Sequence, residues 1–164
     1  MMPFRRGFTL IEVMVVLAVI AILALMAMPS MQGRLVREQI VEAARFADFA
    51  KAPVAQAWRT TATLPADNAA AGLPEPHRIV SNHVASLTVE DGALHIVFGH
   101  QANGALRGKT LSLRPGVVED SPVVPVAWVC GHAAPPEPMV ARGADRTDIE
   151  RRFLPLNCQG PATP

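Results

Sequence analysis

The sequence predicts an α+β fold in which a long N-terminal α-helix packs on a four-stranded antiparallel sheet. Two patterns support this prediction. Residues 8–28 contain only two polar side chains, Thr9 and Glu12, so 19 of these 21 residues are apolar. Further along, apolar residues first recur every three or four positions and later alternate, which indicates an amphipathic helix followed by strands. With 15 Lys+Arg against 14 Asp+Glu, the chain lacks the basic excess typical of a nucleic-acid-binding protein.

The apolar segment 8–28 has the length of a membrane-spanning helix. At 1.5 Å per residue it rises about 31 Å, close to the roughly 30 Å of a bilayer's hydrocarbon core. Arg5 and Arg6 stand just ahead of it, and the positive-inside rule keeps such a flank in the cytoplasm. We therefore predict a single crossing, with the rest of the chain exported. The small residue Gly7 precedes the apolar run, so cleavage there would leave the helix on the mature protein.

Glu12 is the one acidic residue in the apolar segment. A carboxylate costs on the order of 2–3 kcal/mol at mid-bilayer and less near the edge, so it needs compensation. Cleavage after Gly7 would create an α-amine at Phe8, four residues away, which could neutralise Glu12 within one subunit or between subunits. Alternatively, Glu12 reaches the membrane interface and stays solvated. Position and hydropathy leave both interpretations open.

The helix is expected to continue beyond the membrane segment, over residues 29–59. Pro29 and Gly33 weaken it locally, so we expect a kink there, with Pro53 as a second candidate for a kink. An apolar stripe then follows one helical face. Its members are Val36, Ile40, Ala43, Ala47, Ala50, Val54 and Trp58.

A loop and a sheet should follow the helix. Residues 64–76 are rich in turn formers and form the predicted loop. Residues 84–89 and 93–98 alternate on either side of Asp91-Gly92, which is a strong hairpin signal. Residues 110–114 and 123–130 complete the predicted four strands, and the helical stripe covers one face of the sheet. Trp58 and Trp128 fall on apolar faces and are predicted to lie in the core, where each indole needs a hydrogen-bond acceptor.

The first residues also resemble a known family. The run Arg5-Arg6-Gly7-Phe8-Thr9-Leu10-Ile11-Glu12 looks like the leader and N-terminal helix of the type IV pilin superfamily, which includes the type II secretion pseudopilins. This resemblance implies that a prepilin peptidase cuts after Gly7 and methylates Phe8. It also implies that Glu12 is needed for subunit addition.

The resemblance extends into the second half of the chain. Segments 64–73, 103–115, 126–130 and 153–158 look like successive landmarks of type IVa major-type pilins, and the likeness is weakest over residues 131–152. The implied organisation is a cleaved leader (1–7), a transmembrane and filament-core helix (8–28), its amphipathic continuation (29–59) and a pilin head (60–164). The head would contain the loop after the helix, the sheet and a disulfide-bounded loop over residues 130–158.

The two cysteines, Cys130 and Cys158, are expected to form a disulfide because the exported side of the membrane is oxidising. A loop of this size is stabilised by about 3.6 kcal/mol in the chain-entropy account. A zinc site built on Cys130 and His132 is the alternative, but it lacks a second ligand pair at the usual spacing. In the resembling family the disulfide bounds an exposed region of the head.

No pattern in the sequence indicates catalysis, a cofactor or a metal. The stretch from Gly104 to Thr110 has one residue too few between its glycines for a phosphate-binding loop and leads into a strand, so we interpret it as a turn. The five histidines are scattered, and no serine lies in a nucleophile elbow. Four arginines in the disulfide-bounded loop could contact DNA, but interspersed acids leave the segment nearly neutral and favour a solvated charged loop, or salt bridges to a neighbouring subunit. They are Arg142, Arg146, Arg151 and Arg152.

These observations lead to one functional hypothesis and two alternatives. The hypothesis is a structural subunit of a type IV pilus, resident in the inner membrane with its head in the periplasm and later part of an extracellular filament. Its expected partners are other pilin subunits, the prepilin peptidase and an inner-membrane assembly machine. The resemblance implies roles in adhesion, twitching motility and DNA uptake. The alternatives are a minor pilin or type II secretion pseudopilin, and a membrane-tethered periplasmic binding module that never polymerises.

Overall fold

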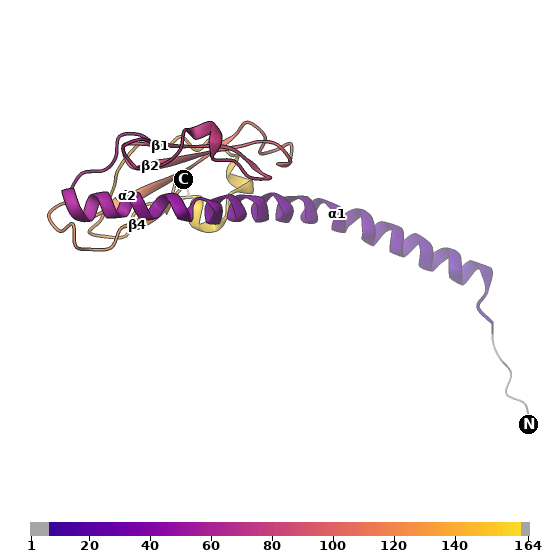
Figure 1. Ribbon diagram of the computed structural model, residues 1–164. Helices are drawn as coiled ribbons and strands as arrows, with labels where there is room; N and C mark the ends of the chain where they lie inside the picture. Colours follow the sequence, from indigo (N-terminus) through magenta and orange to yellow (C-terminus); the bar gives the residue numbers. More distant parts are fainter. Residues whose placement is uncertain (1–6, 162–164) are drawn as a thin grey trace, which may run out of the picture. The chain divides into compact units, whose positions relative to one another are not determined.

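The computed structural model describes residues 7–161, with the side chains of residues 27–32 left aside. Six of the seven leader residues predicted from the sequence, 1–6, lie outside the described part. The chain divides between Leu35 and Val36 into two compact units. Helix α1 (Leu10–Phe46) starts in the first unit and ends in the second, and α2 (Asp48–Thr61) belongs to the second. Figure 1 shows α2 running alongside the strands of the sheet.

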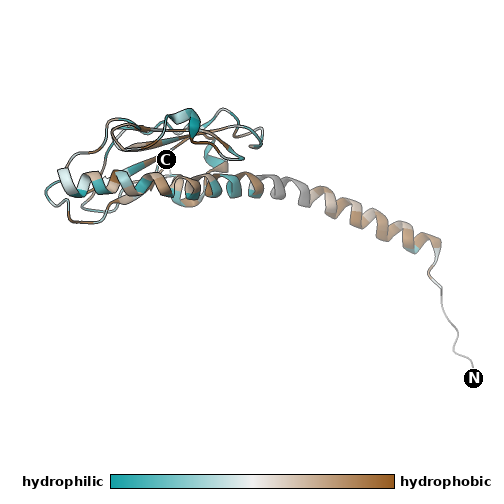
Figure 2. Cartoon of the chain, in the orientation of Figure 1, coloured by the Kyte–Doolittle hydropathy of each residue, from teal (hydrophilic) through white to brown (hydrophobic). Residues whose placement is uncertain are grey.

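The first unit consists of helix and the few residues before it. The large apolar side chains that the structure describes in this unit are exposed, by fractions between 48% at Val13 and 82% at Phe8. Figure 2 shows this first part of α1 as almost uniformly hydrophobic, whereas polar and apolar residues alternate in the later turns. Among the described residues, no helix meets the combined requirement of length and apolar character for crossing a membrane.

The helical segment is interrupted at Ala47, which corrects the expectation of one helix over residues 8–59. Helix α1 continues through Pro29 and Gly33, and the expected kink there stays a prediction. At the interruption, the amide of Ala50 donates to the carbonyl of Ala47 in a tight turn. Pro53, inside α2, lacks an N–H and its ring crowds the carbonyl of Phe49, so the distortion falls in the turn ahead of the proline and not at Pro53.

The sheet has five antiparallel strands instead of the predicted four. They are β1 (Val84–Glu90), β2 (Ala93–Phe98), β3 (Thr110–Val117), β4 (Ala127–Cys130) and β5 (Val140–Ala141). The order is β1-β2-β3-β4, and the short β5 pairs with the end of β3 at Gly116 and Val117. The predicted hairpin is present, with Asp91 and Gly92 both at positive φ between β1 and β2.

Two strand boundaries differ from the prediction, both in segments that contain proline. Strand β4 begins at Ala127, not at residue 123, since Pro122 and Pro125 cannot donate to a ladder. Strand β3 runs three residues further than predicted and keeps Pro115 and Gly116 in the ladder. Three short 3₁₀ helices complete the described part of the fold: η1 (Pro76–Arg78), η2 (Arg151–Phe153) and η3 (Leu156–Cys158).

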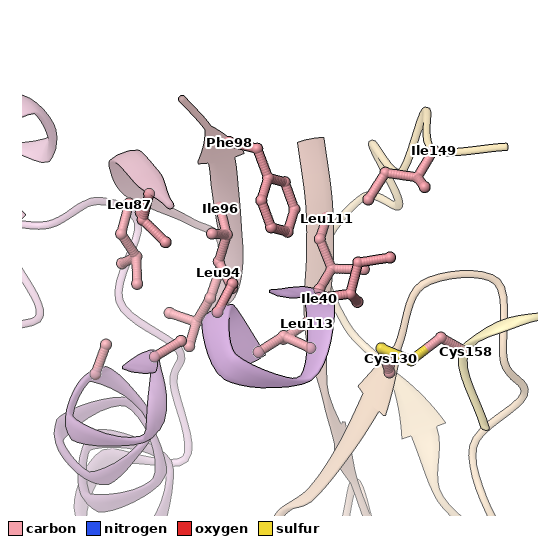
Figure 3. Close-up of a cluster of buried hydrophobic side chains, with 14 of the residues drawn as sticks. Ile40, Leu87, Leu94, Ile96, Phe98, Leu111, Leu113, Cys130, Ile149 and Cys158 are labelled. Carbon is pink, nitrogen blue, oxygen red and sulfur yellow. A yellow bond between two sulfur atoms is a disulfide. The ribbon is translucent and has the colours of Figure 1, made fainter. Parts of the chain in front are cut away.

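The core lies between the helical stripe and one face of the sheet. All seven residues of the predicted stripe, from Val36 to Trp58, are at most 6% exposed. Six of them, all except Trp58, pack in one cluster with side chains from β1, β2 and β3, which Figure 3 shows gathered around Ile40. The sheet side of this cluster includes Leu87, Leu94, Ile96, Phe98, Leu111 and Leu113. This packing confirms that the second half of the helical segment covers the sheet.

Candidate assembly site and disulfide-bounded loop

Thr9 caps the start of α1 and so positions Glu12. The amide of Glu12 donates to the Thr9 side-chain oxygen at 3.3 Å and to its carbonyl at 3.1 Å. Thr9 and Glu12 therefore stand at the two positions of a Thr-x-x-Glu capping box. This places the Glu12 carboxylate in the first turn, where the helix dipole favours a negative charge. The dipole therefore offsets part of the cost of placing the Glu12 carboxylate in an apolar environment. Hydropathy alone did not suggest this contribution.

Phe8 and Glu12 lie on the same side of the helix start. Together with Val13, Val16 and Leu17 they line a hollow of about 250 Å³. Gly7, just before them, is exposed and has no heavy atom within 4 Å of the place a Cβ would take. The peptide bond between Gly7 and Phe8 is thus sterically open, and an amine at Phe8 would start one helical turn away from Glu12.

The disulfide predicted from the sequence is present. Cys130 at the end of β4 bonds to Cys158 in η3 with an S–S distance of 2.04 Å, and both residues are buried. With its sulfur in this bond, Cys130 cannot serve as a thiolate ligand of zinc beside His132. The bond closes the chain around residues 131–157, and we call this segment the disulfide-bounded loop.

The disulfide-bounded loop runs along β3 and is held there by hydrogen bonds to successive residues. The Thr110 amide donates to the Asp148 carboxylate at 2.6 Å. The Arg146 amide donates to the Ser112 hydroxyl at 2.8 Å, and the Ser112 amide donates to the Thr147 hydroxyl at 3.1 Å. The loop therefore acts as an irregular neighbour of the sheet and not as a free surface segment.

His95 and Ser112 form a buried polar pair beneath this loop. His95 is 3% exposed, and its Nδ1 lies 2.9 Å from the Ser112 hydroxyl oxygen. Burial, helped by the Arg146 cation, lowers the pKa of His95, although the carboxylates of Glu90 and Asp145 oppose this. His95 is therefore neutral at ordinary pH. Its Nε2 is 3.7 Å from Glu90, beyond hydrogen-bonding distance.

Asp145 anchors another turn of the disulfide-bounded loop. Its carboxylate accepts a hydrogen bond from the Thr147 amide at 2.9 Å and lies 2.7 Å from Nδ1 of His132. Burial tends to raise the pKa of Asp145, but the hydrogen bonds of Thr147 and the nearby His132 outweigh it and lower the pKa. Asp145 is consequently ionised above about pH 4.

The four arginines predicted as DNA or salt-bridge candidates all engage groups of this chain. Arg142 pairs with Glu119, and Arg146 lies 2.5 Å from a Glu90 oxygen. Arg152 pairs with Glu150 at 2.8 Å, and Arg151 donates to the carbonyls of Gly160 and Pro161. Three of the four therefore form salt bridges within the chain and Arg151 binds carbonyls, whereas salt bridges to a neighbouring subunit stay a prediction.

Sequence reasoning missed several residues that shape this domain. Asn68 is buried and bonded to β1, and Gln39 on α1 accepts a hydrogen bond from the Asn103 amide at 2.9 Å. The pairing of His95, on β2, with Ser112 was missed as well. All three make contacts to residues 17 or more positions away, for which a single sequence carries no local signal.

Fold and site together define a class of protein: a subunit with an exposed apolar N-terminal helix and an α+β head whose C-terminal loop is closed by a disulfide. Residues 36–159 match the pilin family, described as bacterial filament proteins, and residues 2–28 match the prokaryotic N-terminal methylation motif. The chain belongs to the pilin family. Membership implies polymerisation with other pilins and processing by a prepilin peptidase.

Named relatives align with nearly the whole chain. The type IV major pilin protein PilE1 of Neisseria gonorrhoeae is 32% identical over 97% of this chain and 89% of its own length. A fimbrial protein of Neisseria meningitidis serogroup B is 30% identical, covering 94% of both chains. The fimbrial protein EcpC of Eikenella corrodens is 32% identical over 98% of this chain and 94% of its own.

Proposed function

We propose that the protein is a structural subunit of a type IV pilus. The observation that carries the proposal is the joint match of both parts of the chain, the methylation motif over residues 2–28 and the pilin family over residues 36–159. Relatives with major pilin names align along almost the full length of the chain, so the similarity is not confined to the N-terminal helix that pilins share with pseudopilins.

The proposal assigns a sequence of states to the chain. Before assembly, residues 8–28 anchor it in the inner membrane by a single pass, with the head (60–164) in the periplasm. The leader (1–7) is removed after Gly7, and the new N-terminus at Phe8 is methylated. After assembly, the same helix lies in the core of an extracellular filament, with residues 29–59 joining it to the head. Exposed apolar side chains along the helix support this packing role.

Glu12 acts in assembly by pairing with the Phe8 amine. An α-amine at the start of a helix places a positive charge next to the positive end of the helix dipole. A carboxylate in the first turn attracts both the amine and the dipole, and so relieves their mutual repulsion. In an apolar environment this pairing matters more than in water because the dielectric constant is low. Phe8 and Glu12 line the same hollow, which supports such a pair within one subunit or between neighbours.

The role is structural and not enzymatic. Force for assembly would come from inner-membrane machinery. Adhesion and twitching motility are consistent with the family, whereas contact with DNA has little support from the internally paired arginines. A minor pilin is the nearest alternative function, since it would share the head and the disulfide.

The proposed role of Glu12 is tested by the substitution Glu12→Gln. The preprotein should still enter the membrane and lose its leader, but the yield of sheared filaments should fall by more than about tenfold, because breaking a buried charge pair costs roughly 3–5 kcal/mol. Glu12→Asp should retain part of the yield, and the exposed head variant Glu137→Gln should be unaffected. Normal filament yield from Glu12→Gln would contradict the pairing.

A further inference from the structure

One hydrogen-bond relay connects the disulfide-bounded loop to a buried histidine. His95 lies on β2, and its Nδ1 is 2.9 Å from the hydroxyl oxygen of Ser112 on the neighbouring strand β3. The same oxygen accepts a hydrogen bond from the Arg146 amide of the loop at 2.8 Å. Ser112 is 0% exposed and His95 is 3% exposed, so water does not compete for these groups.

The relay favours one neutral form of His95. Ser112 has a single hydroxyl proton, and its oxygen already accepts from the Arg146 amide. If the hydroxyl proton points to Nδ1, every group of the relay is used, and the imidazole proton sits on Nε2. In the other tautomer Nδ1 would donate to Ser112, and the hydroxyl proton would have no acceptor within the described part of the chain. The hydroxyl of Ser112 therefore donates to His95.

Three charged groups among the described residues act on His95. Glu90, at the end of β1, has one carboxylate oxygen 3.7 Å from Nε2 and the other 2.5 Å from the Arg146 guanidinium. Nε2 itself is buried and has no hydrogen bond. Burial and the Arg146 cation lower the pKa of His95, although the carboxylates of Glu90 and Asp145 oppose them. A proton on His95 would thus place Glu90 between two cations.

Such a proton weakens both attachments of Arg146. Because Nδ1 becomes a donor, the Ser112 hydroxyl must turn its own proton away, and its oxygen is then shared between two donors. The displaced hydroxyl proton is buried without an acceptor, which is unfavourable. At the same time the charged imidazole attracts the Glu90 carboxylate away from the Arg146 side chain. The backbone hydrogen bond and the ion pair of Arg146 are therefore weakened together.

We propose that protonation of His95 acts as a latch that releases Arg146 from the sheet while the rest of the head stays folded. Arg146 is exposed, so its release requires no rearrangement of the core. Once separated from Glu90, its guanidinium is free to pair with an anion outside the chain. Mild acid would in this way change the exposed part of the disulfide-bounded loop.

Two other attachments of the loop do not include His95 and should persist in acid. The Thr110 amide donates to the Asp148 carboxylate at 2.6 Å. The Gly131 amide donates to the Ser112 carbonyl at 2.8 Å. Their persistence distinguishes release of Arg146 from unfolding of the whole head.

Amide hydrogen exchange followed by NMR tests the latch on the ¹⁵N-labelled full chain in detergent micelles. The ring C–H signals of His95 report its titration, and the exchange rate of the Arg146 amide, relative to its intrinsic rate at each pH, reports opening. Between about pH 7.5 and pH 4.5 the protection of the Arg146 amide should fall about tenfold and follow the titration of His95. The Thr110 and Gly131 amides should keep their protection to within about twofold.

Matched variants identify the group that takes up the proton. His95→Asn retains an acceptor for the Ser112 hydroxyl but cannot titrate, so the protection of the Arg146 amide should no longer depend on pH. His132→Asn removes the histidine that contacts Asp145 and should keep the full pH dependence. Glu90→Gln should move the titration of His95 to lower pH, because the Glu90 carboxylate raises the pKa of His95.

Four outcomes overturn the proposal. In the first, His95 does not titrate above about pH 4.5, and in the second, His95 titrates while the Arg146 amide keeps its protection. In the third, the Thr110 and Gly131 amides lose protection together with the Arg146 amide, as in unfolding of the head. In the fourth, the pH dependence survives in His95→Asn. These readings are made on unassembled subunits and do not depend on filament formation.

Discussion

The side-chain oxygen of Asn68 accepts a hydrogen bond from the backbone amide of Val89 at 2.6 Å. The amide nitrogen of the same side chain donates to the carbonyls of Leu87 and Pro74. Asn68 is 6% exposed, so these bonds are made away from water. One side chain therefore joins the loop after α2 to the edge strand β1, and it satisfies backbone groups that no neighbouring strand reaches.

Replacing this side chain should destabilise the head. Asn68→Ala leaves the Val89 amide without its partner and should lower the free energy of unfolding by about 2–3 kcal/mol. Asn68→Asp should not rescue it, because a carboxylate cannot donate to the two carbonyls. Chemical denaturation followed by tryptophan fluorescence measures both. Asn82→Ala, at an exposed position, is the control and should change little. Equal stability of Asn68→Ala and the control would refute the role given to Asn68.

The stability of the head should fall as the pH drops below about 6.5. The pKa of His95 is lowered in the folded state from its ordinary value of 6.5, so the unfolded chain binds the additional proton at mildly acidic pH. The contribution of neutral His95 is complete above about pH 6.5 and decreases as the pH falls toward the folded pKa. Denaturation midpoints measured between pH 7.5 and pH 5 should therefore decrease steadily.

A substitution identifies His95 as the source of this pH dependence. His95→Asn can still accept a hydrogen bond from the Ser112 hydroxyl but cannot titrate, so the decrease between pH 7.5 and pH 5 should flatten. His77→Gln, at an exposed position, should retain the full decrease. Asp145 affects stability in a separate pH range. Because its pKa is lowered in the folded state, the stability contributed by its ionised carboxylate is lost only below about pH 4. An unchanged slope in His95→Asn would assign the effect elsewhere.

The disulfide should stabilise the head by holding the disulfide-bounded loop. The two cysteines are separated by 28 positions, and closing a loop of this size contributes about 3.6 kcal/mol in the chain-entropy account. The double substitution Cys130→Ala/Cys158→Ala should lower the free energy of unfolding by roughly that amount. Wild-type protein with a reductant should behave the same way. If reduction leaves the denaturation midpoint unmoved, the loop is held by its contacts to β3 alone.

The sequence predicted the parts of the fold that follow local patterns. The helical stripe from Val36 to Trp58 and the Asp91-Gly92 hairpin both appear as predicted, because periodicity and turn chemistry act over a few residues. Strand β5 was missed because its partner at Gly116 lies about 25 positions earlier in the chain and only two residues pair. The break at Ala47 was missed because alanine favours a helix, and the distortion comes from Pro53, six residues later.

In the candidate site, too, the residues of a local motif could be predicted, whereas contacts between distant segments could not. Gly7, Phe8 and Glu12 belong to one contiguous motif, so they were recognised in the sequence, and their roles stay predictions. The pairing of His95 with Ser112 and the unsatisfied indole of Trp58 depend on segments brought together only by folding. Trp58 was expected to be buried with an acceptor nearby; it is buried, but no described residue supplies that acceptor.

Mass spectrometry of filaments sheared from the cell surface tests the central claim most directly. If the protein is a pilus subunit, it should be an abundant component of the sheared material, and its N-terminal peptide should begin at Phe8 and carry one methyl group. The two cysteines should be recovered as a linked pair. Absence of the protein from the filaments, with all of it found as membrane-bound monomer still carrying Met1 to Gly7, would contradict the proposed function.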